Sequence, residues 1–130
     1  MQASADAELE NAFTILAEAH FGGLVVASNP LFNNLRDHVL KLTVALKVPA
    51  VYEIRQFVVG GGLMSYGPSV PEIYRQIAIY AGRVLTGETA SDLPVLQPAK
   101  CDMAVNLKTA KTLGIDVPMS ILLRADEVIE

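Results

Sequence analysis

The stretch Gly60–Ser69, which reads GGGLMSYGPS, holds the residues whose types and spacing come nearest to a chemical site. Gly62 and Gly67 have the spacing of the two glycines in the phosphate-binding loop G-x-x-x-x-G-K-[ST], in which the lysine meets the phosphates. Pro68 stands where that lysine is needed, and it also removes a backbone N–H donor. We therefore reject a phosphate site and expect the first three glycines to turn the chain from a short helix into a strand.

The other reactive side chains are too isolated to form a catalytic or metal site. His20 and His38 have no second ligand at metal-binding spacing, and Cys101 has no histidine close to it in sequence. No serine lies in a G-x-S-x-G nucleophile elbow. The sequence thus predicts a protein that is not an enzyme and that uses no metal ion and no organic cofactor. The alternative, an enzyme on a doubly wound fold, would have no nucleophile or base to assign.

The composition is that of one globular domain. The chain has 130 residues, of which 52% are hydrophobic and 18% charged, and this is too apolar for a disordered protein. The formal net charge of −4 and the lack of Lys/Arg runs argue against a nucleic-acid partner. The apolar runs are too short to cross a bilayer. The acidic stretch Met1–Glu8 lacks an export signal, which taken alone indicates a soluble protein and also fits a chain that begins partway into a longer one.

Helices and strands alternate along the first half of the chain. Apolar residues recur at helical spacing after Asp6, a suitable N-cap, and short β-branched runs between turn residues are typical of buried parallel strands. The expected elements are a helix at Ala7–His20, a strand at Leu24–Ala27, a helix capped by Asn33 or Asn34 with the apolar stripe Leu35, Val39, Leu42 and Leu46, a strand at Ala50–Tyr52, one or two helical turns at Ile54–Val59, and a strand at Leu63–Tyr66.

The second half contains one long amphipathic helix and a group of shorter elements. Pro71 fits the first turn of the long helix and Gly87 its C-terminal end. Its buried face would carry Ile73, Ile77, Ala81 and Val84. The shorter elements are a strand at Met103–Val105, a helix at Leu107–Leu113 between the caps Asn106 and Gly114, and a last helix capped by Ser120 that carries Leu122, Ala125 and Ile129. Strands alternating with helices predict an α/β fold with a layered parallel sheet and right-handed crossovers.

Three loops should meet at the carboxyl edge of this sheet, where open parallel sheets bind ligands. They are Ser28–Phe32, Tyr52–Arg55 and Ser65–Ser69, the last leading into Tyr74. The candidate ligand-binding residues are Asn29, Phe32, Tyr52, Glu53, Arg55, Ser65 and Tyr66. These residues suit a small polar or zwitterionic solute. Aromatic faces would pack against its body, Arg55 and helix-end N–H groups would bind a carboxylate, and Glu53 would bind an ammonium group. The alternative remains that Tyr52 is a half-buried strand residue and that Glu53 and Arg55 form an ordinary surface pair.

Four motifs in these loops and in the C-terminal half are similar to those of a known family. The sequence PAVYEIRQFVVGGGLMSYG, at Pro49–Gly67, resembles the exported substrate-binding proteins of ABC transporters. YAGRVLTGETASDLPVLQP at Tyr80–Pro98, NLKTAKTLGIDVP at Asn106–Pro118 and LLRADEVIE at Leu122–Glu130 resemble later motifs of the same family, in the same order. The resemblance covers essentially the whole chain.

The resemblance implies a two-lobed protein about twice this length, of which this chain would be the C-terminal portion. Family members begin with an export signal, reside in the periplasm and hold their solute in a cleft between two α/β lobes. Residues 1–67 would then belong to the second lobe, a Rossmann-like, periplasmic-binding-protein-like unit. Residues 68–130 would form a crossover helix and a C-terminal segment that returns between the lobes, so that the fold also includes a segment of the partner lobe. Gly67, Pro68 and Ser69 would be the hinge.

The family also implies the partners, which are a small amino-acid-like solute and an ABC permease. The sequence departs from the family pattern in two places. Members commonly have an Asp before the proline of the first loop, where this chain has Ser28-Asn29-Pro30, and this leaves the type of ligand open. The segment Ala99–Ala104 replaces the usual T-K-F-E-L-V and alters only a strand.

The second hypothesis is structural, namely a homodimeric α/β module without affinity for a ligand. If Gly67–Ser69 crosses between lobes, the helix that starts near Pro71 should not cover the sheet of its own chain. Its apolar face would then need cover from the terminal helix or from a second chain, and large exposed apolar patches drive association.

Overall fold

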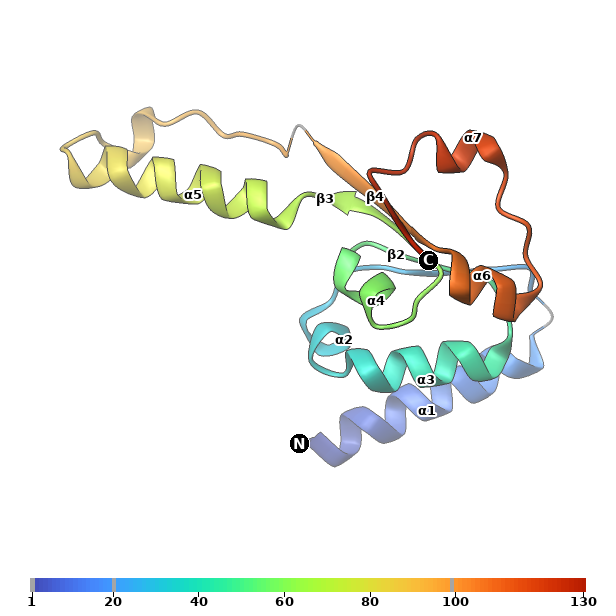
Figure 1. Cartoon of the computed structure of the whole chain (residues 1–130). Helices are drawn as coiled ribbons and strands as arrows, with labels where there is room; N and C mark the ends of the chain where they lie inside the picture. Colours follow the sequence, from blue (N-terminus) through green and yellow to red (C-terminus); the bar gives the residue numbers. More distant parts are fainter. Residues whose placement is uncertain (1, 20, 99) are drawn as a thin grey trace.

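The protein is an α/β unit built on one five-stranded sheet (Figure 1), and this confirms the expected fold class. The computed structural model describes residues 2–19, 21–98 and 100–130, with side chains described from Ala7 onward. The strands are β1 (Leu24–Val26), β2 (Ala50–Tyr52), β3 (Met64–Pro68), β4 (Cys101–Asn106) and β5 (Glu127–Ile129), and they neighbour one another in that order. β1, β2 and β3 run parallel, β4 is antiparallel to β3, and β5 is parallel to β4.

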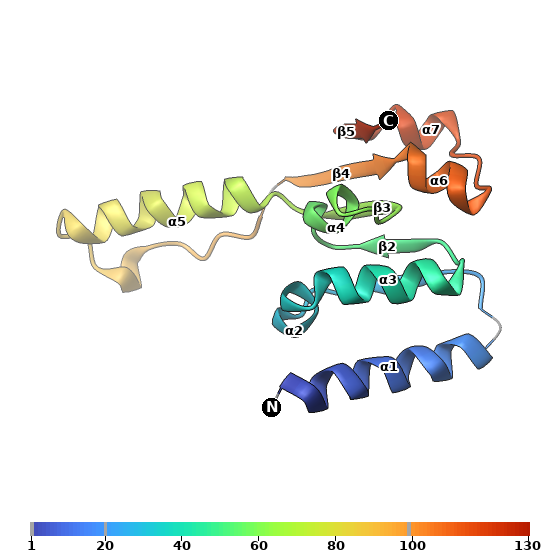
Figure 2. The ribbon, with the colours of Figure 1, turned by 60° about the horizontal axis from the view of Figure 1, so that its bottom comes forward.

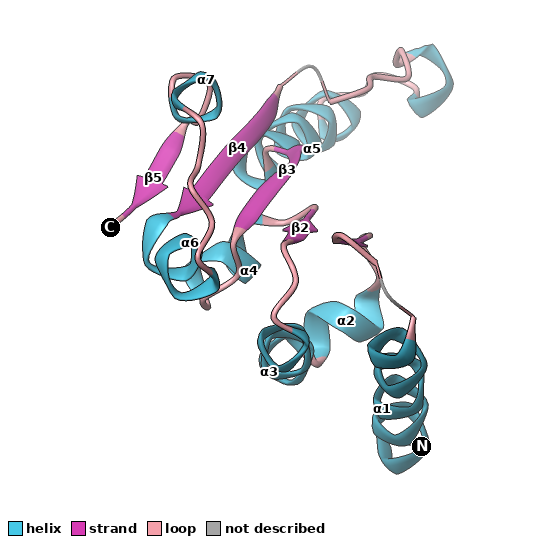
Figure 3. Ribbon diagram, turned by 90° about the vertical axis from the view of Figure 1, so that its right-hand side faces the viewer, coloured by secondary structure: helices cyan, strands magenta, loops and turns pink. Residues whose placement is uncertain are grey.

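Most helices cover one face of the sheet. They are α1 (Gln2–Glu18), α2 (Pro30–Asn34), α3 (Arg36–Leu46), α4 (Arg55–Val59) and α6 (Leu107–Leu113), and they lie on the same side of the strands in Figures 1 and 3. The four-residue helix α7 (Met119–Leu122) lies on the other side, near β5. Two different faces result, one layered with helices and one largely bare.

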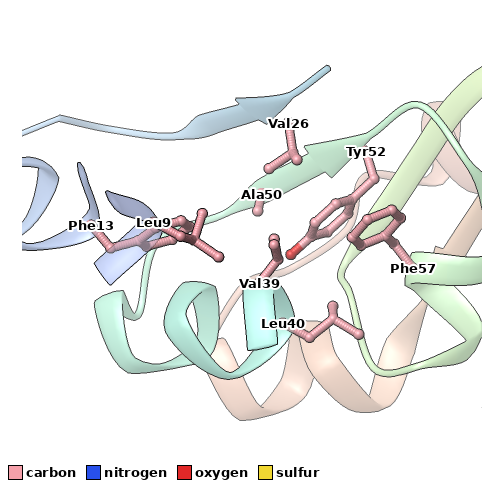
Figure 4. Packing of buried hydrophobic residues seen from close by; sticks show 8 residues of the cluster. All are labelled: Leu9, Phe13, Val26, Val39, Leu40, Ala50, Tyr52 and Phe57. Atoms are coloured by element: carbon pink, nitrogen blue, oxygen red, sulfur yellow. The ribbon is translucent and has the colours of Figure 1, made fainter. Parts of the chain in front are cut away.

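The core lies between the sheet and α1, α3 and α4. Val26 of β1 and the β2 residues Ala50 and Tyr52 are buried on this side, and Figure 4 shows them packed against side chains from the three helices. The cluster consists of Leu9, Phe13, Val26, Val39, Leu40, Ala50, Tyr52 and Phe57. The rings of Tyr52 and Phe57 stack with their centroids 4.8 Å apart. Apolar burial of this kind supplies the main driving force for folding the first half of the chain.

One helix leaves the sheet altogether. The 16-residue helix α5 (Val70–Leu85) projects away from the strands, and a short 3-10 turn at Ala90–Asp92 leads into an extended return segment beside it (Figures 1 and 2). The Tyr80 hydroxyl donates a hydrogen bond to the Pro94 carbonyl, 2.6 Å away, and so holds the two together. We call residues 70–100 the arm. As expected, α5 does not cover the sheet of its own chain. The terminal helix α7 does not cover α5.

Residues 101–130 return to the sheet formed by residues 24–68. β4 pairs with β3 over five residues of each strand, from Met64 opposite Val105 to Pro68 opposite Cys101. Of residues 70–130, the arm stands apart from the sheet. The segment that follows the arm completes the sheet.

Several predicted element boundaries were wrong in the first half. α1 already includes Asp6, so this residue is not its N-cap, and the helix ends at Glu18. His20 lies outside the described residues. Asn33 and Asn34 do not cap α3, because they belong to α2, whose N-cap is Asn29.

The prediction of the last helix was also wrong. α7 ends at Leu122, and Ser120 lies inside it, since its N-cap is Pro118. Ile129 belongs to β5 instead of a helix. The Asp126 backbone N–H donates to the Met103 carbonyl at 2.8 Å, and pairing with β4 then continues along the strand.

Candidate functional site

The loops that follow β1 and β2 meet at the carboxyl edge of the sheet. The Glu53 carboxylate accepts a hydrogen bond from the Ser28 backbone N–H through Oε2, at 2.8 Å. This contact joins Glu53, the first residue after β2, to Ser28, the second residue after the neighbouring parallel strand β1. Beside it, the Asn29 side chain accepts from the Leu31 N–H at 2.8 Å and caps α2, so its amide oxygen is committed to the loop. We call Ser28, Asn29, Glu53 and Gly67 the carboxyl-edge cluster.

Gly67 belongs to this cluster because it gives the Glu53 backbone room to approach. A Cβ at position 67 would lie 2.1 Å from the Glu53 carbonyl oxygen and 2.8 Å from its Cγ. Only a glycine allows two chain segments to approach so closely. The third predicted loop therefore does meet the second, through backbone contact at β3.

The two segments that connect the sheet to the arm run side by side. The Ser69 N–H donates to the Lys100 carbonyl at 3.2 Å. The Lys100 ammonium lies 2.9 Å from Asp102 Oδ1 and 3.5 Å from Asp126 Oδ1. Hydrogen bonding with Ser69, followed by hydrogen bonding with Lys100, lowers the pKa of Asp102. Hydrogen bonding with Asp102 and the charges of both carboxylates raise the pKa of Lys100. Asp126 Oδ2 accepts from the Met103 N–H at 2.9 Å, so the connection is tied to the entry of β5. Sequence reasoning missed this network because its members lie 33 and 57 residues from Ser69, at positions 102 and 126.

Two of the predicted ligand-binding residues lie in the core. Tyr52 is 2% exposed, its hydroxyl lies 2.8 Å from the Thr43 hydroxyl, and burial raises the pKa of its phenol. Ser65 is 1% exposed and points to the same, helix-covered side. Phe32 is half-buried and packs against the core cluster. We therefore exclude Tyr52 and Ser65 from the proposed site and assign them to the packing beneath it.

Two further candidates point elsewhere. Arg55, at the start of α4, forms two hydrogen bonds with Glu127 of β5, one of them 2.6 Å from Nη2 to Oε1. This pair raises the pKa of Arg55 and lowers that of Glu127. Tyr66 is 55% exposed, opposite Met103 on the bare face of the sheet. The structure therefore brings Glu53 together with Gly67 and with Ser28, the neighbour of Asn29, but does not add Arg55 or Tyr66 to them.

Two concave surfaces lie outside the carboxyl-edge cluster. A groove of about 930 Å³ runs between α5 and the return segment and is lined mainly by apolar residues, including Ile73, Ile77 and Leu96. A second hollow of about 530 Å³ lies on the bare face of the sheet around Met64 and Tyr66.

Neither a metal site nor a membrane span is found in the part of the chain that the structure describes. No three His, Cys, Asp or Glu side chains gather there as ligands. His38 lies 3.5 Å from Glu10, and Cys101 is exposed. Among residues 2–19, 21–98 and 100–130, no helix has both the length and the apolar character that crossing a bilayer requires.

Solved structures share this fold. A conserved domain protein from Vibrio cholerae O1 biovar El Tor str. N16961 superposes with a TM-score of 0.85, and an ABC domain in complex with L-Trp from Streptococcus pneumonia with 0.87. A ligand-free, open structure of a substrate-binding protein with adhesive properties from Clostridium difficile gives 0.64. Each is 23% identical to this chain and matches 95% of it. The chain spans only 41% or 42% of the length of these proteins.

The sequence comparison gives the family. No curated protein matches the chain. The family described as "ABC transporter substrate binding protein" matches residues 1–129, nearly the whole sequence. The resemblance seen in the four sequence motifs is thereby confirmed, and the chain belongs to the ABC transporter substrate-binding protein family.

Proposed function

We propose that the protein is the solute-binding component of an ABC import system, which binds a small amino-acid-like solute and delivers it to a membrane permease outside the cytoplasm. The observation that carries this proposal is the carboxyl-edge cluster, in which Glu53 stands at the ends of two parallel strands and is held by the Ser28 N–H. Ligands of open α/β sheets bind at this edge. The family and the L-Trp complex of one similar structure support an amino-acid-like solute.

In this proposal Glu53 binds the ammonium group of the solute. Its Oε2 is oriented by Ser28, and a carboxylate fixed in this way is a strong acceptor for a charged donor. The carboxylate of the solute would bind at the start of α5, just beyond Gly67, where no side chain caps the helix and the helix dipole favours a negative charge. Asn29 lies next to Ser28 in the first loop, whereas Phe32 packs against the core cluster. Arg55 is left out because Glu127 already occupies its guanidinium group.

In the same proposal the hinge residues connect two lobes. Residues 24–68 and 101–130 would form one lobe, and the arm would pack within a second lobe. The paired segments at Ser69 and Lys100 would then be the two crossing strands. A solute that contacts both lobes favours the closed state because it binds that state more tightly.

Isothermal titration calorimetry with a panel of amino acids tests this function. The titrated sample is the full protein, including any residues that adjoin this sequence in its gene. We expect at least one amino acid to bind and Glu53→Gln to weaken it about tenfold or more, because a hydrogen bond to a charged group contributes about 1.5–3 kcal/mol. Glu88→Gln is the matched control, since Glu88 pairs with Arg83 on the arm, far from the cluster. Equal affinities in the two variants, or no binding by any amino acid, would contradict the proposal.

A second candidate, a homodimeric module without affinity for a ligand, is favoured by one observation. The arm exposes Tyr74, Ile77 and Leu85 to solvent. Association through such a surface does not exclude solute binding. Light scattering that shows a stable monomer at tens of micromolar would remove this candidate.

A further inference from the structure

The first crossing strand, which leads from β3 into α5, is held to the sheet as far as the nitrogen of Ser69. β3 ends at Pro68, whose partner in β4 is Cys101. The Ser69 N–H then donates to the Lys100 carbonyl at 3.2 Å and continues this pairing by one residue. The arm leaves the sheet immediately afterwards (Figures 1 and 2).

The carbonyl of the same residue belongs to the helix. The Ile73 N–H donates to the Ser69 carbonyl at 3.0 Å, in the first turn of α5. Peptide units are planar, so a chain turns only about the φ and ψ angles of its residues. Because Ser69 bonds to the strand through its N–H and to the helix through its carbonyl, its own φ and ψ are the two backbone rotations that separate sheet from helix.

The side chain of Ser69 is directed to the sheet and not to the helix. A serine just before a helix commonly caps it by accepting a backbone N–H. Ser69 makes no such bond with α5. Its hydrogen bonding is instead with Asp102 of β4, and this lowers the pKa of that carboxyl. A rotation of α5 about Ser69 therefore breaks no side-chain cap.

Lys100 fixes the strand that receives the Ser69 N–H. Its ammonium lies 2.9 Å from Asp102 Oδ1 and 3.5 Å from Asp126 Oδ1. Asp126 is itself held by the Met103 N–H at 2.9 Å. A network of several charges holds a geometry better than one exposed ion pair does. We call Lys100, Asp102 and Asp126 the clamp.

Gly67 and Pro68 are not free to absorb a rotation. Gly67 pairs with β4 and does not have a positive φ, and its missing Cβ leaves room for the Glu53 carbonyl. It is therefore a glycine for close packing rather than for flexibility. The ring of Pro68 fixes its φ, and this residue is also paired with β4.

We propose that the arm turns relative to the sheet about Ser69 alone on the first crossing strand, and that the clamp keeps the strand before it rigid with the sheet. Domain hinges are a few residues at the ends of elements that absorb the change in φ and ψ. The inference rests on the two-lobed arrangement of the proposed function. It narrows the hinge expected at Gly67–Ser69 to its last residue.

This pivot separates the two ends of the proposed solute site. Glu53, which would bind the ammonium group, is packed against Gly67 on the sheet side of Ser69. The start of α5, which would bind the carboxylate, lies on the other side of Ser69. A rotation at this one residue therefore changes the distance between the two binding groups without disturbing β3.

Pulsed electron paramagnetic resonance on the full protein without solute tests the pivot. Spin labels are attached to Asp37→Cys on α3 and Asp92→Cys on the arm, both exposed positions, with Cys101 replaced by serine. Ser69→Gly should widen the distribution of distances between the labels about twofold, because glycine populates positive and negative φ equally well. Pro68→Ala is the matched control and should leave the width unchanged, since position 68 stays paired with β4.

Two results would overturn the proposal. An unchanged width in Ser69→Gly would place the rotation elsewhere, and equal widening in Pro68→Ala would mean that the hinge includes β3. No solute is added, so the result does not depend on whether an amino acid binds. Failure of the proposed function in calorimetry and failure of the pivot are thereby distinguishable.

Hydrogen exchange of the same protein tests the clamp and does not require the Ser69 variant to fold. We expect Lys100→Met to speed exchange of the Ser69 amide several-fold, because the carbonyl that accepts its bond is released. Lys111→Met is the matched control, since Lys111 is exposed on α6, beyond the opposite end of β4, and should leave this amide unchanged. Equal exchange rates of the Ser69 amide in the natural protein and in Lys100→Met would contradict the clamp.

Discussion

Replacing Gly67 with alanine should destabilise the protein by displacing β3 from Glu53. The added Cβ would lie 2.1 Å from the Glu53 carbonyl oxygen, whereas real Cβ atoms almost never come within 3.0 Å of another heavy atom. The contact needs a shift of about 0.9 Å between two backbone segments that are fixed on both sides by strand pairing. Overpacking of this kind costs about 1–3 kcal/mol. We expect Gly67→Ala to lose free energy of unfolding within or above that range, because the obstacle is backbone and not a flexible side chain.

Urea unfolding followed by circular dichroism measures this loss, with Gly82→Ala as the matched control. Gly82 lies within α5, and a Cβ there would meet nothing within 4 Å. The control should therefore gain about 0.5–1 kcal/mol, since alanine favours a helix interior more than glycine does. Equal stability of Gly67→Ala and the natural sequence would refute the close approach of Gly67 and Glu53, and with it the geometry of the carboxyl-edge cluster.

The remaining predictions concern a buried hydroxyl and an ion pair on the arm. Tyr52→Phe should lose about 1 kcal/mol of unfolding free energy, because it removes the hydrogen bond to Thr43 in the core. Tyr80→Phe removes an exposed hydrogen bond and should lose less in the same urea experiment. Glu72 should titrate at about 2 by carbon-13 NMR instead of at 4.5, because its hydrogen bonds with Arg75 lower its pKa. Since the pKa is lower in the folded state, this pair stabilises α5 above pH 4.5, and the stabilisation is lost as the pH falls towards 2. Arg75→Met should raise the titration midpoint, and an unchanged midpoint would contradict the assignment.

The parallel part of the fold could be predicted from local sequence. Leu24–Val26 and Ala50–Tyr52 are short, apolar and bounded by turn residues, so their strands follow from composition. Helix α5 of the arm was predictable because Pro71 and Gly87 lie at the two ends of an amphipathic stretch. The C-terminal strand was not, because Glu127–Ile129 is too short to show a period and forms only by pairing with β4. Tertiary pairing decides between helix and strand for such segments.

The candidate site was predictable in part, for a related reason. Loops after parallel strands meet at one edge whatever their sequence, and this correctly placed Asn29, Glu53 and Gly67 near one another. The direction of a single side chain depends on which face of its strand is covered. Tyr52 ends its strand on the helix side and is buried, and its place in the sequence alone did not show that its ring packs in the core.

The central claim, that a solute binds at the carboxyl edge of the sheet, is tested most directly by NMR. Amide shifts of the isotope-labelled full protein are followed while L-tryptophan and the other amino acids are added one at a time. The proposed site predicts that, for the amino acid that binds, the largest shifts fall on Ser28, Glu53 and Gly67. Largest shifts along the arm groove, at Ile77 and Leu96, or the absence of saturable shifts with every amino acid, would contradict it.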